Sequence, residues 1–111
     1  MPDQNPMLDK LLKSLDDIQA IDIKVLDVHK QTTITDYMII ASGRASRHVK
    51  AIAQKVMDDM KLAGLPAMGS NGVDSGDWAL IDFGDFIVHI MQPESRQFYN
   101  LEGLWEEHPK V

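Results

Sequence analysis

The residues that could take part in catalysis are first of all four histidines, His29, His48, His89 and His108. None of them has another histidine, aspartate or glutamate at a spacing that recurs in metal sites, and the chain has no cysteine, so a structural zinc site is not expected. The sequence also contains no Gly-x-Ser-x-Gly nucleophile elbow and no glycine-rich phosphate loop. Because catalytic groups occur in positioned sets, we interpret the histidines as hydrogen-bonded or partly exposed side chains.

One arrangement approaches a catalytic pattern. Gly69-Ser70 followed by Asp82 resembles the opening of a nucleotidyltransferase site, in which two acids one residue apart hold magnesium ions on one strand face. Here position 84 is glycine, and the next acid, Asp85, is expected on a turn. Since Asp82 alone cannot hold two ions, we predict that the chain is not an enzyme and uses no metal or cofactor. A degenerate nucleotidyltransferase is kept as an alternative.

A basic cluster raises the question of nucleic acid binding. Its members are Arg44, Arg47, His48, Lys50, Lys55 and Lys61. Helical spacing spreads these side chains around a solvent side, Asp58 and Asp59 interrupt them, and no aromatic platform accompanies them. This favours a solvated helix face, and we expect little direct contact with nucleic acid.

The charge distribution points instead to a basic partner. Over 111 residues the net charge is −6, and residues 64–111 hold eight acids and two bases, so 2 − 8 = −6 places the whole excess there. Such a field repels phosphate backbones and attracts basic surfaces, although simple solubility explains it equally well. The polar start, the absence of cysteine and the lack of long apolar runs lead us to expect a cytoplasmic protein without a membrane span.

The elements that must position these residues follow from periodicity and turn signals. We predict one domain, residues 1–111, with an α/β fold in which helices pack on a mixed five-stranded sheet in the order α-β-β-α-β-β-β-α. The predicted helices cover residues 6–20, 46–63 and, as short turns, 94–107. The predicted strands cover 21–28, with Ile21, Ile23 and Val25 on one face, then 37–41, 67–68, 78–83 and 86–91, with loop at 69–72 and a tight turn at Gly84-Asp85.

The strand that begins at Trp78 carries apolar groups on both faces. Trp78, Leu80 and Asp82 share one face, and Ala79, Ile81 and Phe83 share the other. Two substantial helices can hardly cover both faces of such a sheet. One interpretation is therefore an exposed patch, extended by Tyr99, Leu104 and Trp105 and rimmed by acids, that docks on a basic protein. The other is that the terminal helix covers this face.

Several stretches in order resemble one protein family. They are ITDYMIIASG at 34–43, SRHV at 46–49, DW at 77–78, DFGD at 82–85, VHIM at 88–91 and ESRQFYNLEGLW at 94–105. Between about residues 8 and 106 the chain resembles the ribosomal silencing factor family, also called Iojap-like. The resemblance implies a sheet distantly similar to that of nucleotidyltransferases but without their chemistry.

The resemblance also implies a partner and a mechanism. Members bind a basic protein on the intersubunit face of the large ribosomal subunit, L-fourteen, and sterically prevent the small subunit from joining, which represses translation when nutrients are scarce, as in stationary phase. The alternatives kept are a large-subunit assembly factor and, as above, a degenerate transferase; homodimers are also compatible. The resemblance assigns partner contacts to Trp78, Tyr99, Phe83, Met91 and Glu94. Electrostatic reasoning adds Asp82 and Asp85 to this set.

Overall fold

A computed structural model describes residues 5–105 of the chain. Its elements are α1 (Pro6–Asp17), β1 (Ile21–Asp27), β2 (Tyr37–Ser42), α2 (Ser46–Leu62), β3 (Gly69–Asn71), β4 (Trp78–Asp82), β5 (Phe86–Met91), α3 (Pro93–Tyr99) and α4 (Leu101–Trp105). The predicted order of helices and strands is confirmed, with the C-terminal turns resolved into two short helices. His108 lies outside the described residues, as do the side chains of Leu104 and Trp105.

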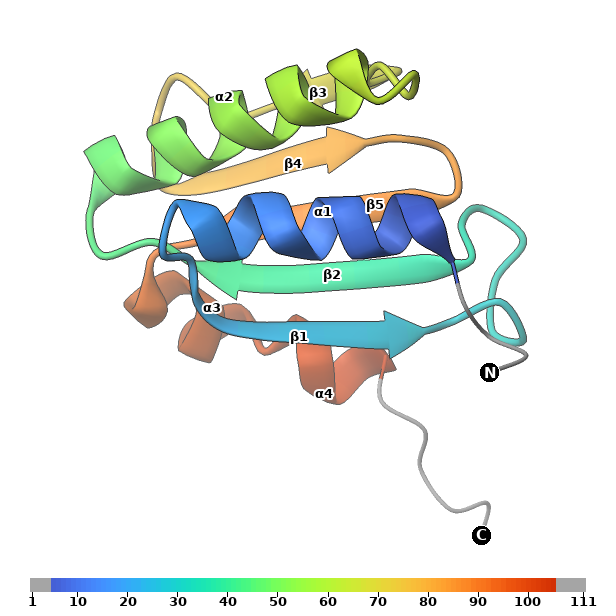
Figure 1. Cartoon of the computed structure of the whole chain (residues 1–111). Coiled ribbons are helices and arrows are strands. Elements are labelled where there is room, and N and C mark those ends of the chain that lie inside the picture. Colours follow the sequence, from blue (N-terminus) through green and yellow to red (C-terminus); the bar gives the residue numbers. More distant parts are fainter. Residues whose placement is uncertain (1–4, 106–111) are drawn as a thin grey trace, which may run out of the picture.

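The strands form one mixed sheet in the order β1-β2-β5-β4-β3. β2 and β5 run parallel, and every other neighbouring pair runs antiparallel. α1 and α2 lie side by side on one face of this sheet, and α3 and α4 lie on the opposite face (Figure 1). We call the face under α1 and α2, with Ile39, Ala41, Ala79, Ile81, Val88 and Ile90, the covered face. We call the opposite face, with Met38, Ile40, Trp78, Leu80, Asp82, Ile87, His89 and Met91, the second face.

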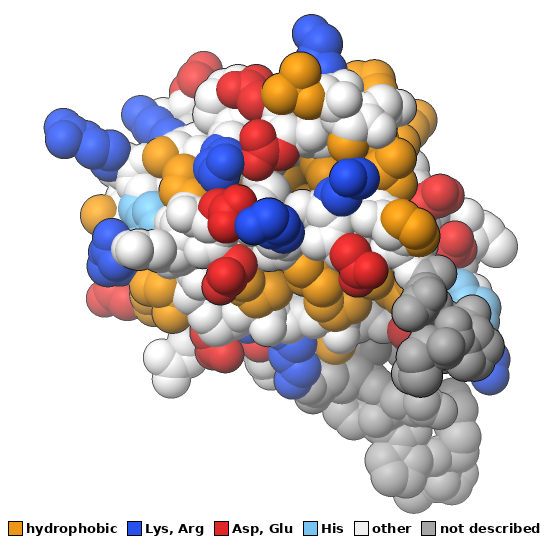
Figure 2. Space-filling view, viewed as in Figure 1, with side chains coloured by type: hydrophobic (Ala, Val, Ile, Leu, Met, Phe, Trp, Pro, Cys, Tyr) orange, Lys and Arg blue, Asp and Glu red, His pale blue; other side chains and the backbone are white. Residues whose placement is uncertain are grey.

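The two long helices close the covered face. Asn5 caps α1 by accepting a hydrogen bond from the Leu8 amide at 3.2 Å, and Pro6 occupies the first turn. α2 buries Val49, Ile52, Ala53, Val56 and Met60 along one stripe, as its apolar spacing predicts. The exposed surface over these helices intersperses Lys and Arg with Asp and Glu (Figure 2). This side of the molecule therefore combines a sealed core with a mixed-charge exterior.

The central part of the sheet agrees with the sequence. Met38, Ile39, Ile40, Ala41 and Ser42 of β2 are all buried, which confirms that both faces of this strand are covered. The predicted hairpin is also present: the Phe83 amide donates to the Phe86 carbonyl at 2.8 Å, and Gly84 has a φ of +88°. That positive φ suits glycine at the first position of a type II′ turn.

The first strand differs from its prediction through a β-bulge. Asp22 has a φ of +54°, and the register with β2 shifts between Ile21 and Lys24. Ile21 consequently pairs with Ser42 on the second face, whereas Ile23 packs against the core of the covered face. The prediction that Ile21 shares a face with Ile23 was wrong because a bulge exchanges the faces of the residues before it.

The third strand was predicted two residues too early. It comprises Gly69–Asn71, which the sequence suggested as loop, and pairs with β4 from Asp82 to Leu80. Its residues are polar or lack a side chain and all are exposed, so they carry no hydrophobic signal. The strand exists because β4 offers a hydrogen-bonding edge.

Candidate docking surface

The second face is only partly covered. Leu26, Val28, Met38 and Ile40 form a small core there, against which Leu101 of α4 packs. Toward β4 the cover ends, and Trp78 and Leu80 remain partly exposed. Together with Asn71 and Gly72, these two side chains line an open hollow of about 300 Å³. The terminal helices thus cover the β1–β2 side of this face and leave its β4 side open, so the predicted patch is exposed at Trp78 and Leu80, while its role in docking stays a prediction.

Trp78 is held in one orientation from two sides. Its indole N–H donates to Nδ1 of His89 at 3.0 Å, and the ring of Tyr99 lies 4.7 Å away, centroid to centroid, at an angle of 45°. Tilted aromatic contacts of this kind are favourable beyond the area that they bury. The indole therefore presents a fixed, partly exposed ring to solvent.

His89 supports this arrangement as a neutral side chain. Burial in the sheet lowers the pKa of His89 from 6.5 to about 4. Since Nδ1 accepts the indole proton, the ring carries its own proton on Nε2. The interpretation of this histidine as a hydrogen-bonded side chain is confirmed. The same is true of His48, whose Nδ1 accepts from the Arg44 amide at 2.9 Å and whose Nε2 donates to the Ile18 carbonyl at 2.9 Å.

α3 extends the aromatic group into solvent. Tyr99 is 50% exposed, and Phe98, which meets it edge to face at 5.1 Å, is 80% exposed. We call Trp78, Phe98 and Tyr99 the aromatic trio. Phe98 was not among the predicted contact residues, although it stands beside Tyr99 in the 94–105 stretch. A helical projection that turned Arg96 toward the sheet would have placed Phe98 outward.

The start of α3 is fastened to the loop before β4. The hydroxyl of Ser95 donates to the Asp77 carboxylate at 2.8 Å. Gln92 forms two further hydrogen bonds: its side-chain amide donates to the Gly76 carbonyl at 3.0 Å, and its backbone amide donates to the Asp77 carbonyl at 3.2 Å. These bonds join the segment that carries Tyr99 to the segment that carries Trp78. The trio is therefore assembled from two parts of the chain about 20 residues apart.

Two predicted contact residues are not on the surface. Phe83 is 2% exposed and belongs to the core of the covered face, because it continues the alternation of Ala79 and Ile81. Met91 is fully buried on the second face, where it pairs with Ser42 on one side and Trp78 on the other. The expectation that these side chains contact a partner is corrected: Met91 lies beneath the second face, and Phe83 lies in the core on the other side of the sheet.

The predicted acids fall into two groups. Glu94 is exposed in the first turn of α3, at the same end of the molecule as Asp77. Asp82 and the exposed Asp85 lie at the hairpin end, and Asp82 accepts a hydrogen bond from the Gly84 amide at 2.8 Å. Asp82 lies four residue steps along the strand from Trp78, a distance of about 13 Å. The acids therefore flank the open part of the second face at its two ends.

Hardly any positive charge offsets these acids locally. Within residues 64–105 the one lysine or arginine is Arg96, which is buried and paired with Glu102. By contrast, Arg44, Arg47 and Lys50 are exposed at the start of α2. The side of the sheet under α1 and α2 thus carries charges of both signs, whereas the exposed charges of residues 64–105 are all negative.

The nucleotidyltransferase alternative would need bound metal ions. Residues 5–105 contain no group of three or more histidine, aspartate or glutamate side chains placed to hold a metal ion. Gly84 stands where a second magnesium-binding acid is needed, and Asp85 lies beyond β4 on the turn. None of the helices within residues 5–105 is long and apolar enough to cross a membrane.

Comparison with known proteins gives concordant results. Residues 2–111 match the model of a family described as "Ribosomal silencing factor during starvation". Ribosomal silencing factor RsfS of Zymomonas mobilis is 45% identical over 103 residues, covering 93% of this chain and 77% of that protein. A crystal structure of a Chromobacterium violaceum protein superposes with a TM-score of 0.89 at 39% identity, covering 96% of this chain and 89% of that one.

A eukaryotic relative carries a different name. The mouse protein named "Mitochondrial assembly of ribosomal large subunit protein 1" is 37% identical over 101 residues, covering 88% of this chain and 44% of the mouse protein. The bacterial relatives are named ribosomal silencing factors, which describes a regulatory role.

Proposed function

The chain belongs to the ribosomal silencing factor family, and from that premise we propose that it binds the large ribosomal subunit and blocks joining of the small subunit. The partner on the subunit is the basic intersubunit-face protein L-fourteen, and the place of action is the cytoplasm, where ribosomes work. Translation is repressed as a result when nutrients are limiting.

The observation that carries this proposal is the aromatic trio beside the uncovered Leu80. Aromatic side chains that are partly exposed yet held in one orientation give up little conformational entropy on binding, and they dominate the energetics of many interfaces. Trp78 is held by His89 and Tyr99, and a hollow opens next to it. Such a surface is suited to receive side chains of a partner protein.

Charge supports the choice of a basic partner. Ribosomal proteins are mostly basic, and acids at both ends of the open face, Glu94 at one and Asp82 with Asp85 at the other, favour encounter with such a protein. Exposed charges of this kind act mainly on the association rate. The apolar ring contacts then provide most of the affinity.

Blocking requires no conformational change. The molecule measures 41 × 33 × 23 Å along its principal axes. An object of that size bound to the intersubunit face keeps the two subunits more than 20 Å apart at that point, because its shortest dimension is 23 Å. Occupancy alone is therefore sufficient for inhibition.

Trp78→Ala tests the proposal directly. We expect the variant to fold and to lose at least about 2 kcal/mol of binding free energy, a weakening of roughly 30-fold, because it removes the central ring of the trio. Co-sedimentation with purified large subunits measures the affinity, and the yield of joined ribosomes measures the inhibition. Leu62→Ala is the matched control, since Leu62 is 88% exposed at the end of α2 on the other side of the sheet. Unchanged subunit binding by a folded Trp78→Ala protein would contradict the assignment.

A second candidate function is assistance in large-subunit assembly, which the name of the mouse relative favours. Both functions use a surface on the large subunit, but they differ in its state. A silencing factor binds mature subunits and lowers the yield of joined ribosomes. An assembly factor co-sediments with immature particles, and its removal leaves such particles to accumulate. Gradient profiles of cells with and without the protein therefore separate the two.

A further inference from the structure

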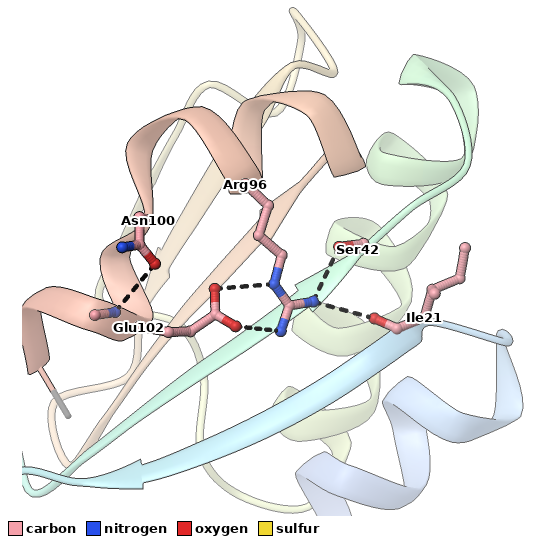
Figure 3. A network of polar contacts seen from close by, with 6 residues as sticks. Ile21, Ser42, Arg96, Asn100 and Glu102 are labelled. Carbon is pink, nitrogen blue, oxygen red and sulfur yellow. Dashed lines mark hydrogen bonds and ion pairs between the residues drawn. The ribbon is translucent and has the colours of Figure 1, made fainter.

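Arg96 is unusual among residues 5–105 because it is the one lysine, arginine, aspartate or glutamate that is buried, with 6% of its surface exposed. Burying a charge is unfavourable unless it is paired and its donors are satisfied. Nε and Nη2 of Arg96 donate to the two carboxylate oxygens of Glu102 at 3.1 and 2.9 Å (Figure 3). This two-pronged contact is the strongest geometry available to an arginine and a carboxylate.

The third nitrogen of the guanidinium forms hydrogen bonds with the sheet. Nη1 of Arg96 donates to Oγ of Ser42 at 3.0 Å and, more weakly, to the carbonyl of Ile21 at 3.4 Å (Figure 3). Ile21 and Ser42 are paired across β1 and β2, just before the bulge at Asp22. The guanidinium therefore joins α3 and α4 to the ends of two strands at once.

The helices that it joins cannot hold themselves in place. α3 has seven residues and α4 has five, and isolated helices of that length are unstable in water. Between them Asn100 adopts a left-handed conformation with a φ of +48°, which ends α3, and its side chain accepts from the Gly103 amide at 3.3 Å. The position of this segment depends on its contacts with the rest of the molecule.

The ion pair encloses the exposed rings. Arg96 and Glu102 close a loop of chain that contains Phe98 and Tyr99, and Tyr99 is the residue that contacts Trp78. Both charged groups are largely withdrawn from solvent: the Arg96 side chain is 7% exposed and that of Glu102 is 20% exposed. We therefore expect their contribution to a docked complex to act mainly through the residues that lie between them.

We propose that Arg96 is a positioning residue for docking, which through its pair with Glu102 holds Tyr99 against Trp78, with Phe98 beside Tyr99, so that the aromatic trio exists before the partner arrives. This inference rests on the proposed function of the trio as the docking surface. A preformed surface binds more tightly than one that must be ordered on contact, because the ordering entropy is already spent in folding.

We call the Arg96–Glu102 ion pair the clamp. Its loss should loosen residues 93–103 and leave the rest of the domain folded. The core of the covered face is built by α1, α2 and the strands, and Arg96 takes no part in it. Local opening of a weakly held segment is common in proteins whose main core stays intact. In Arg96→Gln we therefore expect residues 93–103 to lose amide protection while β2 and β5 keep theirs.

The experiment compares Arg96→Gln and Glu102→Gln with Lys13→Gln. The control also removes one ion pair, Lys13 with Asp17, but an exposed one on α1. Two quantities are measured on each full-length protein: NMR cross-relaxation between the rings of Trp78 and Tyr99, and affinity for purified large ribosomal subunits. We expect both clamp variants to lose the ring cross-peaks and at least tenfold in affinity, and the control to keep the cross-peaks and stay within twofold of the unmodified protein.

Arg96→Lys keeps the charge but cannot form the two-pronged contact, so an intermediate loss in both measurements is expected. If Arg96→Gln fails to fold, Glu102→Gln and Arg96→Lys carry the same comparison. Ring cross-peaks that persist without the clamp would overturn the proposal, as would their loss without any change in affinity. Failure of the unmodified protein to bind subunits would instead refute the proposed function, and the cross-peaks would still decide whether Arg96 positions the rings.

Discussion

The two faces of the sheet differ in how much helix covers them. The covered face lies under helices of 12 and 17 residues, which bury its central strands, whereas the second face has helices of seven and five residues. Short helices bury the β1–β2 side and stop before β4. The open part is where a side chain can be both fixed by neighbours and accessible to a partner. In this fold the covered face therefore provides most of the stability, and the second face of the same strands carries the proposed docking surface.

Neighbouring residues of β4 provide the sharpest test of that division. Ile81 is fully buried on the covered face. We expect Ile81→Ala to lower the free energy of unfolding by about 3–4 kcal/mol, because it removes buried methyl groups and leaves a cavity. Urea unfolding measures this loss. At a concentration where the variant is still folded, its affinity for large subunits should match that of the unmodified protein; a proportional loss of affinity would mean that the faces are not independent.

His89, which is buried on the second face, gives a pH-dependent prediction. Its folded pKa of about 4 lies below the unfolded value of 6.5, so between these values the unfolded chain binds more protons than the folded one. The free energy of unfolding should therefore fall as pH decreases from about 6.5 to about 4, by at most about 3 kcal/mol. Urea unfolding across this range measures the slope.

His89→Gln is the matching variant, because its side chain can still accept the indole N–H of Trp78 but does not titrate. Its unfolding free energy should change less with pH over the same window. An identical pH dependence in the two proteins would show that another group is responsible.

The smallest effect on stability is expected at Leu80, one residue from Ile81 on the opposite face. Leu80 is partly exposed and lines the hollow beside Trp78, so Leu80→Ala should cost about 1 kcal/mol of unfolding free energy. Its affinity for large subunits should nevertheless fall, by roughly fivefold to tenfold, since the apolar floor of the docking surface shrinks. If Leu80→Ala lowered the unfolding free energy as much as Ile81→Ala does and left the affinity for large subunits unchanged, the proposed division between the two faces would be wrong.

Local patterns were sufficient for most of the fold. The apolar stripe of α2, the two-sided burial of β2 and the turn at Gly84 depend on residues near one another in sequence, and each was predicted correctly. The alternation along β4 also separated Trp78 and Leu80 from Ala79 and Ile81. The same alternation put Phe83 with the buried set, so its burial was readable from the sequence even though the family resemblance suggested a contact role.

Features that depend on distant partners were not predictable. β3 has no apolar residue, and only its pairing with β4 makes it a strand. Met91 is buried beneath neighbouring segments, and Arg96 reaches Ser42 and the Ile21 carbonyl only because α3 packs beside the ends of β1 and β2. Each of these requires knowledge of tertiary contacts between segments, which periodicity and turn chemistry do not provide.

The bulge in β1 has a consequence for the behaviour of the protein in a crowded cell. Each outermost strand of a sheet is a potential template for another chain, and regular edges invite stacking into fibrils. Here one edge strand, β1, is interrupted by the bulge at Asp22, and the other, β3, is only three residues long. Neither edge strand offers a long, regular row of backbone hydrogen-bonding groups to another chain. The molecule can therefore expose aromatic rings to a partner without its edge strands favouring aggregation.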